Sequence, residues 1–172
     1  FFEHQGVDWV TTIKACARMF MNDSGMGGST ITQQMIKNYT GKNEILVQRK
    51  VQEIISGILV EKKYSKEEIL EKYMNIIYMG EGCYGVKSAA ASYFGKELQE
   101  LTLAECASLI GITNNPSLYD PYISDQTLAN NRERQLTILD QMLDQGWIDQ
   151  DRYDEAVAQE MVFKSGIADA DR

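Results

Sequence analysis

The sequence predicts an all-α fold, on three observations. Apolar residues recur at intervals of three and four over several segments, which is the spacing of one helix face. Three segments begin with the pattern S/T-x-x-E/Q, the capping box that marks a helix start. No segment shows the strict apolar–polar alternation of a half-buried strand. With 172 residues the chain has the size of one domain, and we expect a single domain over residues 1–172.

Each expected element is bounded by a capping residue or a glycine. In the first half these are a helix over 9–20 capped by Asp8, a loop over 22–28, a helix from Ile31 with the box Thr30–Gln33, a helix over 47–60, and a helix with the box Ser65–Glu68. In the second half they are a loop over 80–85, a small-residue helix ending at Gly95, a helix with the box Thr102–Glu105, a loop over 114–121, and helices over 126–145 and 151–161.

The helix over 47–60 carries an apolar stripe, which we take as its front. The stripe consists of Val47, Val51, Ile54, Ile55 and Ile58. Glu53 then falls on the back of this helix with Arg49, and Lys50 lies to one side.

Composition excludes some classes of function. A net charge of −8 argues against nucleic-acid binding through a broad basic face. Basic residues nevertheless dominate between Lys37 and Lys50, so an anionic ligand is expected there. The three cysteines lack the spacing of zinc ligands and are expected to be free thiols. His4 is the only histidine, which argues against a catalytic triad, and a structural role is expected for it.

The stretch GGSTITQQ, residues 27–34, is rich in neutral hydrogen-bonding groups. A helix beginning at Ile31 would point its free N–H groups and positive dipole end at the Gly27-Gly28 loop, which favours an anion, and the hydroxyls of Ser29 and Thr30 could add donors. Further along this helix the polar side chains that could reach a sugar or a diphosphate are Gln33, Gln34, Lys37 and Asn38. On these residues alone, an ordinary cap on a solvated helix stays an open alternative.

The segment RKVQE, residues 49–53, offers a second set of charges. Arg49 and Lys50 could hold a phosphate, and Glu53 could serve acid–base chemistry or hold a divalent ion. The alternative from these residues alone is an exposed Arg49–Glu53 ion pair that only stabilises the helix.

Taken together and in order, these segments resemble the glycosyltransferase family 51 domain of class A penicillin-binding proteins and monofunctional peptidoglycan transglycosylases. His4 and Gly6 resemble the end of the family's E-D-x-x-F-x-x-H-x-G motif. The further matches are Gly28 to Gln34 with Lys37-Asn38, Arg49-Lys50-x-x-Glu53, Ile69 to Asn75, Tyr93 to Lys96, and Arg134 with Ile138, Leu139 and Met142.

The resemblance implies an all-α, lysozyme-like fold with two lobes, head and jaw. It implies an inverting hexosyltransferase that polymerises lipid II into β-1,4 glycan strands and releases undecaprenyl diphosphate. Glu53 would be catalytic and would assist departure of the diphosphate, directly or through Mg²⁺ or Mn²⁺, with no organic cofactor. The substrate-binding residues would be Ser29, Thr30, Gln33, Gln34, Lys37, Asn38, Arg49 and Lys50, and the residues that shape the site would be His4, Gly28, Asn75 and Arg134.

Implied partners are lipid II, the growing glycan strand, the membrane surface, moenomycin-type inhibitors and a transpeptidase domain in a longer parent chain. The implied location is the extracytoplasmic face of the bacterial cytoplasmic membrane. Apolar residues near Met19–Met26 would suit contact with lipid. Neither a transpeptidase motif nor a segment long enough to span a membrane occurs in residues 1–172.

Three departures from the family pattern stand out. The family's acidic pair, which includes the general base, would fall before Phe1, so the chain as given is expected to be inactive. Ile45 and Gln52 stand where many members have basic residues, and Gly57 replaces a usual alanine. These departures keep two alternatives open, a non-catalytic lipid II- or glycan-binding module and a lytic transglycosylase.

Overall fold

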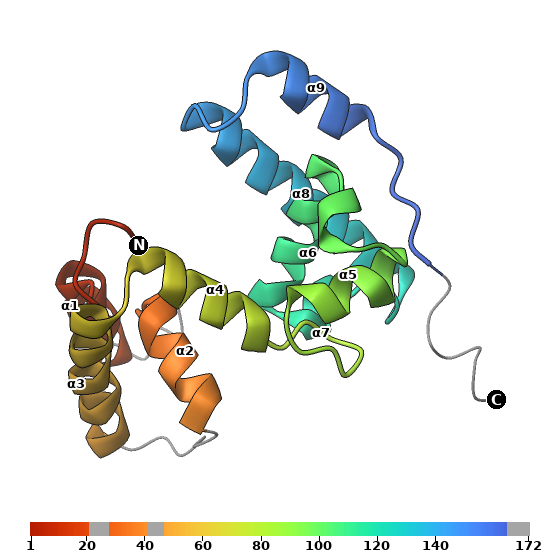
Figure 1. Cartoon of the computed structure of the whole chain (residues 1–172). Coiled ribbons are helices and arrows are strands. Elements are labelled where there is room, and N and C mark those ends of the chain that lie inside the picture. Colours follow the sequence, from red (N-terminus) through yellow and green to blue (C-terminus); the bar gives the residue numbers. More distant parts are fainter. Residues whose placement is uncertain (21–27, 41–46, 165–172) are drawn as a thin grey trace. The chain divides into compact units, whose positions relative to one another are not determined.

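The computed structural model describes residues 1–20, 28–40 and 47–164, and within these ranges the fold is all-α (Figure 1). The only β-type pairing in this part of the chain is an isolated bridge between Tyr78 and Tyr84. The chain divides into two compact units, Phe1–Ile76 and Ile77–Arg172. The division falls inside the span expected to be one domain. The residues near Met19–Met26 suggested for lipid contact lie outside the described side chains.

The first unit contains four helices in its described residues, α1 (Trp9–Phe20), α2 (Ile31–Thr40), α3 (Val47–Lys63) and α4 (Lys66–Ile76). Helix α2 packs against both α3 and α4. Two predicted caps are confirmed: Asp8 Oδ1 accepts from the Thr11 N–H at 3.0 Å, and the Ser65–Glu68 box makes both of its bonds. Local side-chain-to-backbone bonds therefore start these helices where the sequence predicts.

Helix α3 does not use its apolar stripe as the face that packs on α2. Val51 and Ile55 are 49% and 53% exposed, whereas Glu53 is only 5% exposed. The buried face instead follows Glu53, Gly57 and Glu61, which are spaced four residues apart. Glu53 therefore lies on the back of the helix relative to this stripe, as predicted, and α2 packs on that polar back.

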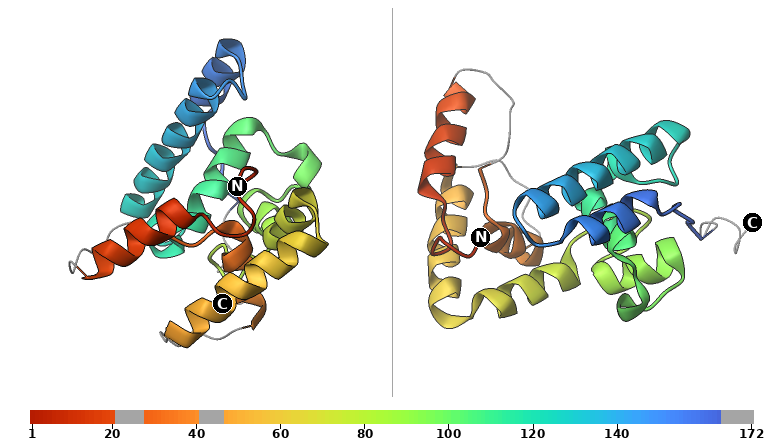
Figure 2. Two further views of the ribbon diagram at one scale, coloured as in Figure 1. Left: turned by 90° about the vertical axis from the view of Figure 1, so that its left-hand side faces the viewer. Right: turned by 90° about the horizontal axis from the view of Figure 1, so that it is seen from above.

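The second unit contains α5 (Val86–Phe94), a 3₁₀ turn η1 (Leu98–Glu100), α6 (Leu103–Asn114), α7 (Pro116–Tyr119), α8 (Asp125–Asp144) and α9 (Gln150–Ala158). Helix α8 packs along α6, and α9 folds back on α8 (Figure 2). One apolar cluster of this unit lies between these three helices. Its buried members are Ala104, Ala107, Leu139, Ile148 and Ala156.

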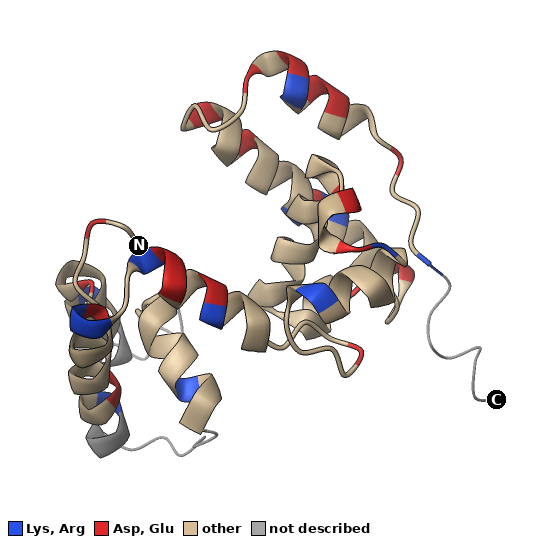
Figure 3. Cartoon of the chain, viewed as in Figure 1, with Lys and Arg blue, Asp and Glu red and all other residues tan. Residues whose placement is uncertain are grey.

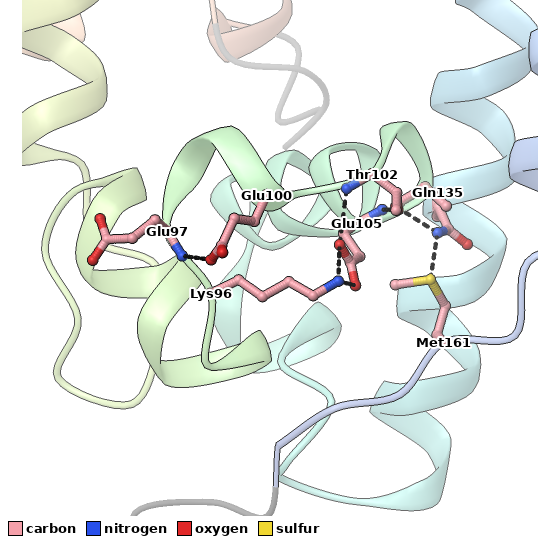
Figure 4. A network of polar contacts seen from close by, with 8 residues as sticks. Lys96, Glu97, Glu100, Thr102, Glu105, Gln135 and Met161 are labelled. Carbon is pink, nitrogen blue, oxygen red and sulfur yellow. Dashed lines mark hydrogen bonds and ion pairs between the residues drawn. The ribbon is translucent and has the colours of Figure 1, made fainter.

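A polar network supports this core (Figure 4). Glu105 completes the predicted box with Thr102 and pairs with Lys96 at 2.7 Å. Nearby, the Gln135 Nε2 group donates to the Ala104 carbonyl at 2.6 Å. Gly95 ends α5 in the left-handed conformation, as predicted.

Two local predictions in this unit need correction. The predicted loop over 114–121 contains the short helix α7, because Pro116 has the backbone φ that a first helical residue needs. Helix α9 ends at Ala158 rather than at 161. None of the helices in the described ranges combines the length and the apolar character of a membrane span.

Candidate functional site

A pocket in the first unit is lined by six residues that the sequence analysis singled out. It has a volume of about 260 Å³, and its lining consists of Ser29, Gln33, Gln34, Lys37, Asn38 and Glu53. These side chains come from the start and exposed face of α2 and from the buried face of α3. Helix α2 carries a single charged residue, Lys37, so most of the α2 contribution is neutral (Figure 3).

The start of α2 is fixed by Thr30. Its hydroxyl oxygen accepts from the Gln33 N–H at 3.2 Å and donates to the Gly6 carbonyl at 2.8 Å. Thr30 is 6% exposed and does not line the pocket. Of the two predicted hydroxyls, Ser29 therefore faces the pocket, and Thr30 lies beneath it.

Lys50 joins α3 to the start of α2. Its Nζ contacts Ser29 Oγ at 2.8 Å, Gln33 Oε1 at 3.0 Å and Glu53 Oε2 at 3.2 Å. Glu53 is buried and not on a solvent-exposed surface as the alternative from the sequence supposed, and the predicted Arg49–Glu53 pair lies outside the described residues. The side chain of Arg49 lies outside the described residues.

Gln33 is fully buried, and its Nε2 has no hydrogen-bond partner among the described residues. The ammonium of Lys50 can only donate, so the oxygen of the Gln33 amide must face Lys50 and the NH₂ group must face away. A buried donor without a partner costs about 1–3 kcal/mol. Gln33, a residue of the pocket lining, therefore has a donor that no described residue uses.

The outer part of the pocket is formed by exposed residues of α2. Gln34 Oε1 accepts from the Tyr73 hydroxyl of α4 at 3.1 Å, which orients this amide and leaves its NH₂ group outward. Burial raises the pKa of Tyr73, so its hydroxyl remains a donor at neutral pH. Lys37 and Asn38 are exposed at the rim. The sequence placed Tyr73 on a helix and within the family motif from Ile69 to Asn75, but it gave no sign of this contact.

The residues expected to shape the site lie in different places. A Cβ added to Gly28 would lie 2.6 Å from the Ala15 Cβ, so glycine is needed where α1 approaches this segment. His4 packs against Phe1, and burial followed by the charge of Lys66 lowers its pKa. Asn75 is exposed on α4 and is not part of the pocket lining. Arg134 belongs to α8 in the other unit.

The described residues hold no group of three or more histidine, cysteine or acidic side chains that could hold a metal ion by themselves. Glu53 is the one carboxylate among the described residues that line this pocket. Mg²⁺ typically binds one or two carboxylates and completes its shell with water and substrate phosphates. Glu53 fits that role only if a ligand supplies most of the oxygens.

Comparison with known proteins agrees with this arrangement. A family model described as Transglycosylase matches residues 1–143. The chain belongs to the transglycosylase family. This match contains every residue of the pocket described above, and it extends from the first unit into α8 of the second.

Individual relatives support the same assignment. The chain is 41% identical over 158 residues to penicillin-binding protein 1A of Pseudomonas aeruginosa, covering 91% of this chain and 19% of that protein. It is 40% identical over 157 residues to a Cupriavidus necator protein provisionally assigned as a transglycosylase, covering 91% of this chain and 67% of that protein. The crystal structure of penicillin-binding protein 1A from Haemophilus influenzae matches with a TM-score of 0.54 and 32% identity over 80% of this chain and 17% of that chain.

These matches confirm the expected resemblance to the glycosyltransferase domain of class A penicillin-binding proteins and the all-α fold class. The transglycosylase family in turn supports glycosyltransferase activity. The chain spans about a fifth of the length of the penicillin-binding protein 1A relatives, 19% for the Pseudomonas aeruginosa protein.

Proposed function

We propose that this chain is a peptidoglycan glycosyltransferase domain that polymerises lipid II into β-1,4 glycan strands and releases undecaprenyl diphosphate. The observation that carries the proposal is the state of Gln33. Its oxygen is held by Lys50, and its buried NH₂ group has no partner in the described part of the chain. A pocket with such a donor, a helix N-terminus, Lys37 in its lining and Lys50 bound to three of its residues suits an anionic, oxygen-rich ligand such as a sugar diphosphate.

The pocket residues would bind the substrate and assist the departure of the diphosphate. The NH₂ group of Gln33 and the N-terminus of α2 would donate to diphosphate oxygens, while Lys37 at the rim would add a second positive charge to that of Lys50. Negative charge accumulates on the diphosphate as the bond to the sugar breaks, so fixed positive groups stabilise the transition state more than the ground state. Arg49 would contribute in the same way.

Glu53 would assist this departure through Lys50. Its carboxylate holds the Lys50 ammonium at 3.2 Å beside Ser29 and Gln33. The family's general base, which would deprotonate the acceptor 4-hydroxyl, has no counterpart in residues 1–172. We therefore assign to these residues the donor side of the reaction, and we expect them to be inactive without that base.

The cationic pocket favours this function over a lytic transglycosylase, whose glycan substrate carries no diphosphate. A lipid II-binding module would use the same pocket without turnover. Mg²⁺ or Mn²⁺ at Glu53, moenomycin-type inhibitors, a transpeptidase domain in the parent protein and a place on the outer face of the cytoplasmic membrane are further parts of the proposal.

Polymerisation of lipid II by the full-length protein, read on a gel, tests the proposal. We expect polymer from the unaltered protein and little from Glu53→Gln. Glu133→Gln, on the exposed surface of α8, is the matched control and should polymerise normally. Equal polymer from all three would remove Glu53 from the mechanism. No polymer from a folded, membrane-bound protein that still binds lipid II would favour the binding module.

A further inference from the structure

A second polar cluster lies behind the pocket and joins three helices. The Thr32 hydroxyl of α2 donates to Glu61 Oε1 of α3 at 2.5 Å. The other oxygen of Glu61 pairs with Lys66 Nζ, at the first residue of α4, at 2.6 Å. The side chains of Glu61 and Lys66 are 5% and 18% exposed. We call Thr32, Glu61 and Lys66 the clamp.

The clamp also holds the first residues of the chain. Lys66 Nζ donates to the His4 carbonyl at 2.5 Å and lies 4.6 Å from the centre of the Phe1 ring. One ammonium therefore contacts α3, the backbone at His4 and an aromatic face. Such a group has little freedom to move, because its partners come from separate segments.

The backbone at Gly6 and at Gly57 lies between the clamp and the pocket. Gly6 has a φ of +85°, and a Cβ added there would lie 2.6 Å from the Gly57 carbonyl and 3.1 Å from Glu61 Cγ. On the pocket side, a Cβ added to Gly57 would lie 3.7 Å from Gln33 Cγ. The residues around Gly6 and Gly57 thus fill the space between Glu61 and Gln33.

The clamp fixes α2 in rotation as well as in distance. Thr32 and Gln33 are consecutive and both fully buried, so their side chains leave the helix about 100° apart. Anchoring Thr32 on Glu61 therefore sets the direction in which Gln33 points. On α3, the residues spaced by four place Glu53 at the pocket end of the buried face and Glu61 at the clamp end.

We propose that Thr32, Glu61 and Lys66 are positioning residues that hold the Gln33 amide in its ligand-binding orientation. This inference rests on the proposed function, because it assumes that the pocket takes a diphosphate. It goes further in assigning three residues outside the pocket to its geometry. None of them lines the pocket, so their effect on a ligand must pass through α2, α3 and the segment around Gly6.

Titration of the protein with inorganic pyrophosphate tests the assignment. We compare Thr32→Val and Lys66→Met with Lys66→Arg, which keeps the charge, and with Lys62→Met, an exposed control with the same change of charge. Each variant is measured below its unfolding transition, as checked by circular dichroism. Thr32→Val and Lys66→Met should weaken binding by about 10- to 100-fold, the range for displacing a site by up to 1 Å. Lys66→Arg should recover most of the affinity, and Lys62→Met should bind as the unaltered protein does.

The side-chain NMR signals of Gln33 give a readout that needs no ligand. The clamp predicts that Thr32→Val and Lys66→Met shift the Gln33 NH₂ resonances, whereas Lys62→Met leaves them in place. If Lys66→Met does not fold, a double variant takes its place in both measurements. This variant combines Glu61→Gln with Lys66→Met and so removes both charges. It should shift these resonances less than Thr32→Val does, because a carboxamide still accepts from Thr32.

The outcomes distinguish the proposed diphosphate pocket from the proposed role of the clamp. Failure of the unaltered protein to bind pyrophosphate would count against the diphosphate pocket, and the Gln33 resonances would then decide the role of the clamp alone. Unchanged Gln33 resonances in folded Thr32→Val would overturn the proposed role of the clamp. If the unaltered protein binds pyrophosphate, an unchanged affinity in Thr32→Val would overturn it as well.

Discussion

The two units each bury a glutamine completely, and they treat it in opposite ways. Gln135 in the second unit donates from Nε2 to the Ala104 carbonyl at 2.6 Å and accepts from Arg132. Gln33 in the first unit accepts from Lys50 but keeps an Nε2 without a partner in the described residues. A satisfied buried amide stabilises a fold, whereas an unsatisfied one costs stability that a ligand could restore by accepting its hydrogen bond.

The surroundings of the two amides follow the same division. Gln135 lies beside the apolar core formed by Ala104 and Leu139. Gln33 lies between charged groups, because Lys50 and Glu53 approach it from α3. The contrast therefore concerns the two glutamines: Gln135 uses its amide to hold the fold together, whereas Gln33 has one donor that no described residue uses. The following predictions test this contrast, from the largest expected effect to the smallest.

Lys50→Met should give the largest effect, a loss of about 100- to 1,000-fold in polymerisation by the full-length protein, as expected for one fixed donor to developing charge. It removes the group that contacts Ser29, Gln33 and Glu53 together. The matched control is Lys87→Met in the second unit, where the lysine is exposed. Equal rates for both variants would mean that the pocket is not the donor site.

Exchanging each buried glutamine for leucine tests the contrast itself. Gln135→Leu should lower the free energy of unfolding by about 1–3 kcal/mol, since it leaves buried partners unsatisfied. Gln33→Leu should change stability less, because one of its polar groups has no partner to lose. Urea unfolding and pyrophosphate titration, run on both, should show opposite patterns. A large stability loss for Gln33→Leu with unchanged binding would refute the distinction.

Two glycines with positive φ allow the stability cost of backbone strain to be distinguished from that of a steric clash. Gly82→Ala should cost about 1–2 kcal/mol, the penalty for a left-handed conformation, since nothing lies within 4 Å of an added Cβ. Gly6→Ala should cost more, because its Cβ would meet the Gly57 carbonyl at 2.6 Å. Thermal unfolding gives both values. A similar loss at the two positions would show that the contact between Gly6 and Gly57 is loose.

A small pH effect should come from His4. Burial and the charge of Lys66 lower its pKa below the ordinary value of 6.5, so the folded state resists its protonation. The unfolded state then binds more protons as the pH falls through about 6.5, and stability decreases over that range. Urea midpoints at neutral and mildly acidic pH should differ more for the unaltered protein than for His4→Gln. An equal difference would place His4 in contact with solvent.

Features that depend on neighbouring residues could be predicted from the sequence. The capping boxes at Ser65 and Thr102 and the glycine that ends α5 are determined by neighbouring residues, and the structure confirms all three. The segments Gly28–Asn38 and Arg49–Glu53 also pointed to one site, because an anion site needs donors and positive charges that a sequence displays directly.

The tertiary structure decided how those residues act. The exposure of Val51 and Ile55 shows that apolar spacing alone does not identify the buried face of α3. Thr32 and Glu61, which pair with each other, lie 29 residues apart in the chain, and Tyr73 and Gln34 lie 39 residues apart. Such contacts depend on how helices pack and rotate against each other, and helical periodicity carries no information on that. The sequence determined the residue types and the helices, and packing determined that the Gln33 NH₂ group has no partner in the described part of the chain, whereas that of Gln135 has one.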